Sequence, residues 1–163
     1  MTDRKAAMEK LLQSYETYYN VNRKTPMPPF TAEASFATHS EGYMLIRAAK
    51  IAAFDAQEYV FFADPEKLDL ATARQLADTV WEEALKRAIP KEEHKSTDGI
   101  LLIIADTIDK EAAAYIKKQR RFKSYQFGLH GSSTLRIAAR DLSQEKTVSN
   151  RHGRDLERLF RDR

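Results

Sequence analysis

The stretch Gly99-Ile100-Leu101-Leu102-Ile103-Ile104-Ala105 decides the fold, because it contains the longest apolar run in the chain. A continuous apolar run of this length is typical of a strand covered on both faces, in the centre of a sheet. It is far too short to cross a bilayer as a helix. We therefore expect a sheet with other elements packed on both sides of residues 99–105.

A helix is predicted before this strand and another after it. Asp69 is a candidate N-cap for a helix over residues 70–88, where apolar residues recur at three- and four-residue spacing until Pro90 ends it. Asp106 or Thr107 is expected to cap the helix that follows the strand. The last turn of that helix is basic, which complements the helix dipole.

Other elements are predicted from the same kinds of periodicity. Further helices are expected over residues 3–19 and 154–162, and loops over 20–29 and 91–98. Phe30, Ala32, Ala34 and Phe36 alternate and predict a strand with these four side chains on one face. The remaining predicted strands cover residues 43–54, 59–62, 124–129, 134–140 and 146–149.

The expected order is helix, three strands, helix, strand, helix, two or three strands, helix. Hairpins mixed with helical crossovers indicate the α+β class, with a mixed β-sheet and helices packed on it. At 163 residues and 42% hydrophobic composition, the chain is expected to form a single domain over residues 1–163.

The composition excludes several classes of site and points to a compartment. There is no cysteine, so disulfides, thiol catalysis and thiolate zinc sites are excluded. The histidines, at positions 39, 94, 130 and 152, lack local metal-ligand spacing, and we expect neither a metal nor a cofactor. Residues 1–5 lack the apolar core of a signal peptide, so we expect a cytoplasmic protein that does not enter the membrane.

Charge is divided unevenly along the chain. Residues 115–163 hold 13 Lys or Arg against 5 Asp or Glu, while residues 1–114 hold 14 against 19. This asymmetry indicates an anionic or acidic partner. Basic side chains neutralise phosphates and release counterions, and the neighbouring Phe122 and Tyr125 are candidates to stack on bases. The predicted phosphate-binding residues are Lys117, Lys118, Arg120, Arg121, Lys123, Arg136, Arg140, Arg151 and Arg154.

Arg136 and Arg140 share parity on their predicted strand, so both are expected to leave the same face, opposite Leu135 and Ile137. The alternative interpretation assigns no ligand to the basic region: it is then a solvated surface whose charges pair with the acidic part of the chain.

A second candidate anion site is the loop Phe127–Ser133. Its glycines allow backbone N–H groups to turn toward an anion, and serine hydroxyls can donate to it. His130 is then a weak candidate for acid or base catalysis. The alternative is an ordinary hairpin loop, since the spacing matches neither a dinucleotide nor a Walker motif. The loop's anion candidates are Gly128, Gly131, Ser132 and Ser133.

Two other motifs carry weaker hypotheses. His152-Gly153 is a second His-Gly pair in basic surroundings. His152 is a candidate general base, and the simpler interpretation, which we favour, is that the pair forms part of a turn over residues 150–153. The element order is loosely compatible with small magnesium-dependent nucleases. Their carboxylate-x-lysine signature is absent from the expected strand end, and the triplet Glu93-His94-Lys95 falls in a predicted loop.

Several stretches resemble a family of uncharacterised prokaryotic proteins of about this length. They are Glu58-Tyr-Val-Phe61, Glu93-His94, Lys123-Ser-Tyr-Gln-Phe-Gly128 and Asn150-Arg-His-Gly-Arg154. The chain departs from the family at Ser132, where an aromatic residue is usual. The resemblance implies a free-standing cytoplasmic domain and assigns no catalytic or binding role.

These observations favour a non-catalytic binding domain whose basic C-terminal surface meets nucleic acid or another polyanion. One alternative is a small enzyme that acts on a phosphorylated or carboxylated small molecule through the Gly128–Ser133 loop. Another is an accessory protein that binds an acidic partner or forms a homodimer. The sequence alone leaves open whether the chain is an enzyme.

Overall fold

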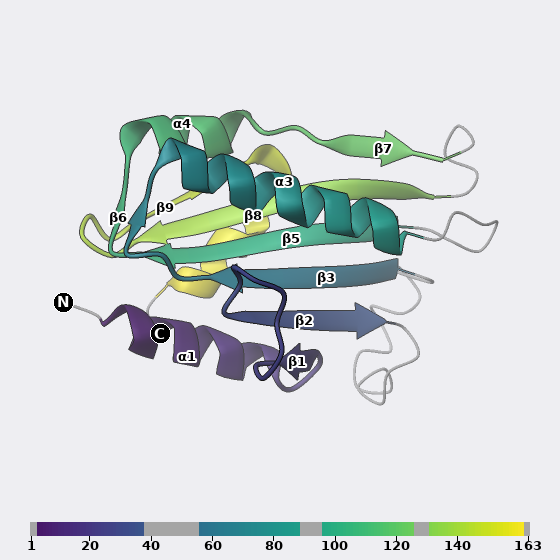
Figure 1. The fold of residues 1–163 in the computed structure, drawn as a ribbon, viewed down its shortest axis with the longest axis horizontal. Coiled ribbons are helices and arrows are strands. Elements are labelled where there is room, and N and C mark those ends of the chain that lie inside the picture. Colours follow the sequence, from purple (N-terminus) through teal and green to yellow (C-terminus); the bar gives the residue numbers. More distant parts are fainter. Residues whose placement is uncertain (1–2, 38–55, 89–95, 126–130, 162–163) are drawn as a thin grey trace.

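The computed structural model describes residues 3–37, 56–88, 96–125 and 131–161, and it has the predicted α+β fold with a mixed sheet. The sheet has the order β1-β2-β3-β5-β8-β7, and β9 also pairs with β8 (Figure 1). Its strands are β1 (Asn20–Asn22), β2 (Ala32–Ala37), β3 (Ala56–Ala63), β5 (Ser96–Ala105), β7 (Phe122–Ser124), β8 (Ser132–Asp141) and β9 (Lys146–Ser149).

The three central strands are parallel, and the outer ones are antiparallel to their neighbours. Strand β5 pairs in parallel with β3 on one side and with β8 on the other. Residues 99–105 of β5 are all buried, which confirms the central strand predicted from the apolar run. Strands β7 and β9 pair with opposite ends of β8, at residues 132–134 and 138–141.

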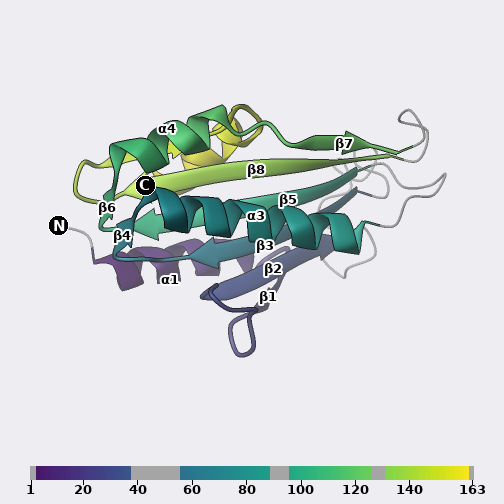
Figure 2. The same ribbon diagram turned by 45° about the horizontal axis from the view of Figure 1, so that its top comes forward.

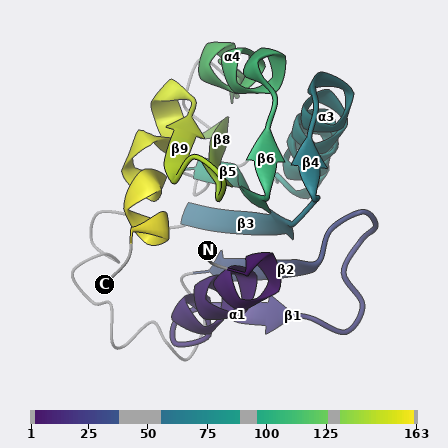
Figure 3. The same ribbon diagram turned by 90° about the vertical axis from the view of Figure 1, so that its left-hand side faces the viewer.

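Helices cover both faces of this sheet. Helices α3 (Leu70–Arg87) and α4 (Lys110–Lys118) lie on one face (Figures 2 and 3). Helix α1 (Arg4–Tyr15) and the 3₁₀ helix η3 (Arg151–Phe160) pack against the other face, so the sheet separates two apolar clusters. No helix in the described ranges is long and apolar enough to span a bilayer.

Helix α3 forms where its cap and apolar stripe predicted it. The Asp69 side chain accepts a hydrogen bond from the Thr72 backbone N–H at 2.8 Å, which satisfies one free donor of the first turn. The helix packs closely on β5, because a Cβ at Gly99 would lie 2.8 Å from the Ala84 Cβ. The glycine that opens the apolar run is therefore required for helix–sheet contact.

The helix after the central strand begins later than predicted, and its N-cap is Asp109, so the prediction of Asp106 or Thr107 as the cap is wrong. Thr107 and Ile108 form strand β6, which pairs in parallel with β4 (Lys67–Leu68) in a separate small sheet. Helix α4 then starts at Lys110, after Asp109. The competing hydrogen bonds to β4 come from a distant segment, so local capping signals did not reveal them.

Several boundaries also differ from the predictions. Strand β1 lies within the expected 20–29 loop, and β5 begins at Ser96, inside the expected 91–98 loop. Phe30 packs in the α3/α4 cluster, on the opposite side from Ala32 and Ala34, because β2 begins only at residue 32. The predicted strand over 43–54 lies outside the described residues.

At the C-terminal side of the chain, β7 covers residues 122–124 instead of the predicted 124–129, of which 126–130 lie outside the described residues. Strands β8 and β9 confirm the predictions for 134–140 and 146–149. Helix η3 begins at Arg151, so the 150–153 segment is its N-cap and first turn and is not a separate turn.

Candidate anion-binding site

Four of the predicted phosphate-binding side chains line one surface depression of about 310 Å³. It lies between the C-terminal end of α4, strand β9 and the first turns of η3, three elements that adjoin one another in Figure 3. We call it the basic hollow, and its lining residues are the cations Lys117, Arg120, Arg151 and Arg154, together with Thr147, Val148, Ser149 and Glu157.

The buried side chain of Asn150 brings the two cationic segments together. Its Nδ2 donates to the backbone oxygens of Leu135 at 2.9 Å and Gln119 at 3.3 Å, and its Oδ1 accepts from the backbone N–H of Ile137 at 3.0 Å. Gln119 directly precedes Arg120, and Asn150 directly precedes Arg151. A single amide thereby ties the end of α4 and the start of η3 to β8.

The geometry of η3 directs its arginines to the hollow. Residues i and i+3 of a 3₁₀ helix lie in one row. Gly153 and Leu156 share the row that is buried against the sheet, while Arg151 and Arg154 are exposed in another. A Cβ at Gly153 would lie 2.3 Å from the Ile137 backbone oxygen, so the first turn of η3 packs this closely only with glycine there.

The four cations are exposed, and none of them forms an ion pair with another described residue. Glu157 is the one carboxylate among the described lining residues. Four positive charges beside a single carboxylate leave a positive local potential that attracts anions. The hydroxyls of Thr147 and Ser149 add neutral donors beside them.

A second depression, of about 560 Å³, continues the positive surface along β9. It shares Lys117, Thr147 and Val148 with the basic hollow and adds Lys110 and Lys146. Its carboxylate, Asp141, is already engaged: it accepts hydrogen bonds from the Ser143 hydroxyl at 2.7 Å and from the backbone N–H groups of Gln144 and Ile108 at 3.0 Å each.

Burial opposes the ionisation of Asp141, but these hydrogen bonds outweigh it and lower the pKa of the carboxyl. The negative charge of Asp141 is therefore stabilised within the fold. We call the two depressions together the basic track.

The remaining predicted cations lie elsewhere. Arg121 pairs with Asp78 at 2.7 Å, and the Lys123 ammonium lies 5.4 Å from the centre of the Tyr125 ring. Arg136 and Arg140 share a face of β8 as predicted, but α1 and η3 cover that face. Lys118 is exposed at the end of α4, and so is Phe122 on β7, at 60%.

The predicted anion loop is only partly within the described residues. Gly128 and His130, the weak catalytic candidate, lie outside them. Gly131 has a φ of 93°, a conformation that favours glycine, and Ser132 is half-buried. Ser133 is buried, and its hydroxyl lies 2.9 Å from the Tyr125 hydroxyl, so its hydrogen bonding is internal.

A half-buried polar cluster on the face of the sheet that α1 and η3 cover was not predicted from the sequence. Arg136 donates to Asp98 at 3.3 Å, to Asp155 at 2.6 Å and to the backbone oxygen of His152 at 2.9 Å. Glu58 is the register partner of Asp98 on β3, and it accepts from the Tyr19 hydroxyl at 2.7 Å. The alternation along β5 could have predicted where the Asp98 side chain lies, since Asp98 has the parity of Ile100 and Leu102, which face α1.

Burial raises the pKa of both Glu58 and Asp98, although Arg136 opposes this shift. For Arg136, burial alone would lower the pKa, but the hydrogen bond and charge of Asp155, with the charges of Asp98 and Glu58, raise it. The described residues contain no group of three or more acidic, histidine or cysteine side chains able to hold a metal ion, and Glu93-His94-Lys95 lies outside them.

One comparison with known proteins identifies a family. The family described as a domain of unknown function, DUF8052, matches residues 3–162, so the chain belongs to it. No curated protein and no solved structure matches the chain.

Proposed function

We propose that this member of the DUF8052 family is a binding domain for a polyanion, with nucleic acid as the preferred ligand, and that the basic track contacts the phosphates. The observation that carries the proposal is the basic hollow, where Lys117, Arg120, Arg151 and Arg154 converge without ion-pair partners among the described residues. Phosphate contacts from such side chains supply most of sequence-independent affinity.

The elongated shape of the basic track favours a ligand with several phosphates in a row over a single small anion. Two depressions joined through Lys117, Thr147 and Val148 run beside β9, and they place Lys110 and Lys146 beyond the basic hollow. A polyphosphate backbone can follow such a line of cations. Phe122, 60% exposed two residues after Arg120, supports a single-stranded nucleic acid, because an exposed ring offers a stacking surface to a base.

The proposal includes the cytoplasm as the compartment. A chain without cysteine is suited to a reducing environment, and nucleic acids are accessible there.

The test measures binding of a single-stranded oligonucleotide and of heparin across a range of salt concentrations. Affinity for the oligonucleotide should fall with salt at a log–log slope of about −0.7 for each phosphate that the protein neutralises. In the double variant Arg151→Glu/Arg154→Glu, the slope should become shallower by about 0.7 for each phosphate that is no longer neutralised. The affinity of this variant should fall at least about tenfold.

The matched control is Lys5→Glu/Lys24→Glu, which makes the same change in net charge at exposed positions on α1 and the loop after β1. It should retain most of the affinity. Equal losses in the two double variants would reject the basic hollow as the site. Phe122→Ala should weaken binding of the oligonucleotide but not of heparin, and equal effects on both would reject base stacking.

A further inference from the structure

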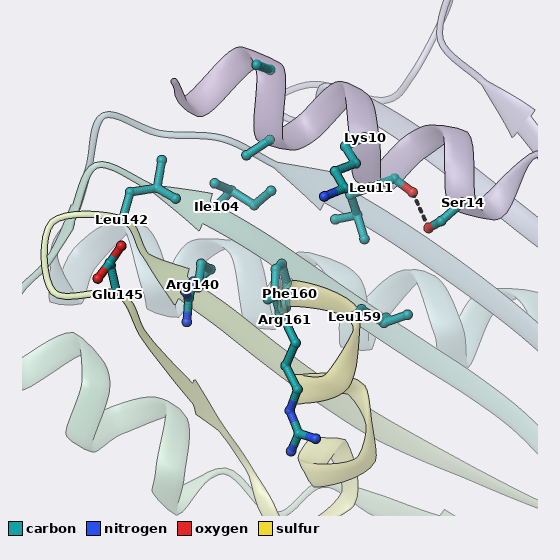
Figure 4. Close-up of a pocket in the computed structure, with 12 residues that line it drawn as sticks. Lys10, Leu11, Ser14, Ile104, Arg140, Leu142, Glu145, Leu159, Phe160 and Arg161 are labelled. Carbon is teal, nitrogen blue, oxygen red and sulfur yellow. Dashed lines mark hydrogen bonds between the residues drawn. The ribbon is translucent and has the colours of Figure 1, made fainter. Parts of the chain in front are cut away.

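Helices α1 and η3 leave an open groove between them on the sheet face that carries the half-buried polar cluster. It has a volume of about 420 Å³, within the usual range for small-molecule sites, and Figure 4 shows its lining. Its floor includes Ile104 and Arg140, next to the carboxyl ends of β5 and β8, where sheets with parallel strands commonly bind ligands. We call it the amphipathic groove.

More of the groove's surface is apolar than polar. Leu11 of α1, Ile104 and Leu142 from the sheet side, and Leu159 and Phe160 of η3 contribute apolar surface. Ser14 also lines the groove, but its hydroxyl donates to the Leu11 backbone oxygen at 2.6 Å (Figure 4). A polar ligand would therefore lose hydrogen bonds to water in the interior without replacing them, and an alkyl chain would not.

The charged lining residues define the other end of the ligand. Lys10, Arg140 and Arg161 line the groove against the single carboxylate of Glu145. Among described residues none of the three cations has an ion-pair partner, although Arg140 donates a hydrogen bond to the Thr147 hydroxyl at 3.2 Å. An apolar interior with an excess of positive charge is complementary to an anion that carries a hydrocarbon tail.

The volume sets the size of that tail. At about 30 Å³ for each non-hydrogen atom, the share of a water molecule in the liquid, a groove of 420 Å³ holds about 14 such atoms. Two of these atoms are the carboxylate oxygens, so we propose that the amphipathic groove binds a medium-chain fatty-acid anion of about ten to twelve carbons. Its chain lies against Ile104, Leu142 and Phe160, and its carboxylate lies near Lys10 and Arg140.

This site is independent of the proposed polyanion function, because the groove and the basic hollow share no described lining residue. The Arg151→Glu/Arg154→Glu variant should therefore bind the fatty acid with the same affinity as the unsubstituted protein. The two proposals can fail separately.

The experiment is calorimetric titration of the full chain with octanoate, decanoate, hexadecanoate and decanol, each below the concentration at which it forms micelles or separates from water. Affinity should rise from octanoate to decanoate by about fourfold per methylene, the ratio that corresponds to about 0.8 kcal/mol. The additional methylenes of hexadecanoate should not raise the affinity above that of decanoate by the same factor, because its tail is longer than the groove. Decanol should bind at least about tenfold more weakly than decanoate, since its head group lacks charge.

Two variants locate the binding. Ala6→Trp places an indole at an exposed helix position that lines the groove, and it should weaken decanoate binding at least tenfold. Lys5→Trp makes the same addition one residue earlier, outside the groove lining, and should bind normally. Lys10→Glu should weaken decanoate but not decanol.

Equal affinity for decanoate and decanol would overturn the proposal, and so would equal binding by the two tryptophan variants. A concentration-dependent dimer that Ala6→Trp alone disrupts would also overturn it, because a second copy of the chain would then cover the groove. Binding of anionic vesicles without binding of monomeric decanoate would assign the groove to a membrane surface and reject a free fatty acid.

Discussion

Asn150 and Gly153 are the residues on which the basic hollow depends, although neither carries charge. Asn150 is 1% exposed and makes three hydrogen bonds to backbone groups of β8 and the residue after α4. Gly153 allows η3 to contact the backbone of Ile137. Within the Asn150-Arg-His-Gly-Arg154 motif, these two residues thus build the support, and the two arginines face the solvent.

Replacing Asn150 with alanine should lower the free energy of unfolding by about 2–3 kcal/mol, because the buried N–H of Ile137 would lose its acceptor. Chemical denaturation measures this change. Asn20→Ala is the matched control, because Asn20 is exposed and no described side-chain hydrogen bond depends on it; it should stay within about 0.5 kcal/mol of the parent. Similar stabilities for the two variants would show that Asn150 is not the link between α4, η3 and β8.

At the scale of elements, the parallel register of β3, β5 and β8 gathers charges on the face covered by α1 and η3. Glu58 and Asp98 are neighbours across β3 and β5, and Arg136 reaches Asp98 from β8. Tyr19 donates to Glu58 from the segment before β1, and Asp155 of η3 adds a further carboxylate. Partial burial raises the pKa of Glu58 and of Asp98, so these two carboxyl groups hold their protons more tightly in the folded state than in the unfolded chain.

The pH dependence of stability follows from these raised pKa values. A carboxyl whose pKa is higher in the folded state binds more protons there, so its contribution to stability is complete below its unfolded pKa and declines as the pH rises. Stability should therefore decrease from about pH 4.5, the ordinary pKa of glutamate, toward neutrality. Glu58→Gln should make this decrease shallower, as measured by denaturation at several pH values.

The control for this experiment is Glu9→Gln. The hydrogen bond from Arg23 lowers the pKa of this exposed carboxyl. The contribution of Glu9 to stability therefore increases as the pH rises, whereas that of Glu58 decreases. An unchanged slope in Glu58→Gln would show that Glu58 ionises in the folded state as readily as in the unfolded chain.

Sequence periodicity predicted those elements whose partners are local or whose pattern is strong. The stripe and cap of α3 and the apolar run of β5 are examples, since both signals lie within the segment itself. The predicted start of α4 is wrong because Thr107 and Ile108 pair instead with strand β4, which lies about forty residues earlier in the chain. Arg136 was assigned to an open surface because the sequence does not say which face of β8 is covered by η3.

At the scale of the whole molecule, the excess of positive charge in residues 115–163 divides among three environments. Some cations line the basic hollow, Arg121 and Arg136 form ion pairs with carboxylates, and Arg140 lines the depression between α1 and η3. Composition predicted the excess but not this division, which arises only when α4, β9 and η3 meet. The candidate site is therefore smaller than the set of residues that the sequence indicated.

The most direct test of the central claim is the mapping of backbone amide chemical shifts while a single-stranded oligonucleotide is added. We expect the largest changes on residues 117–120 and 147–154, which surround the basic hollow. Amides of α1 and of the loop near Lys24 should stay unchanged. Changes concentrated on α1 or spread evenly over the sequence would contradict polyanion binding at the basic hollow.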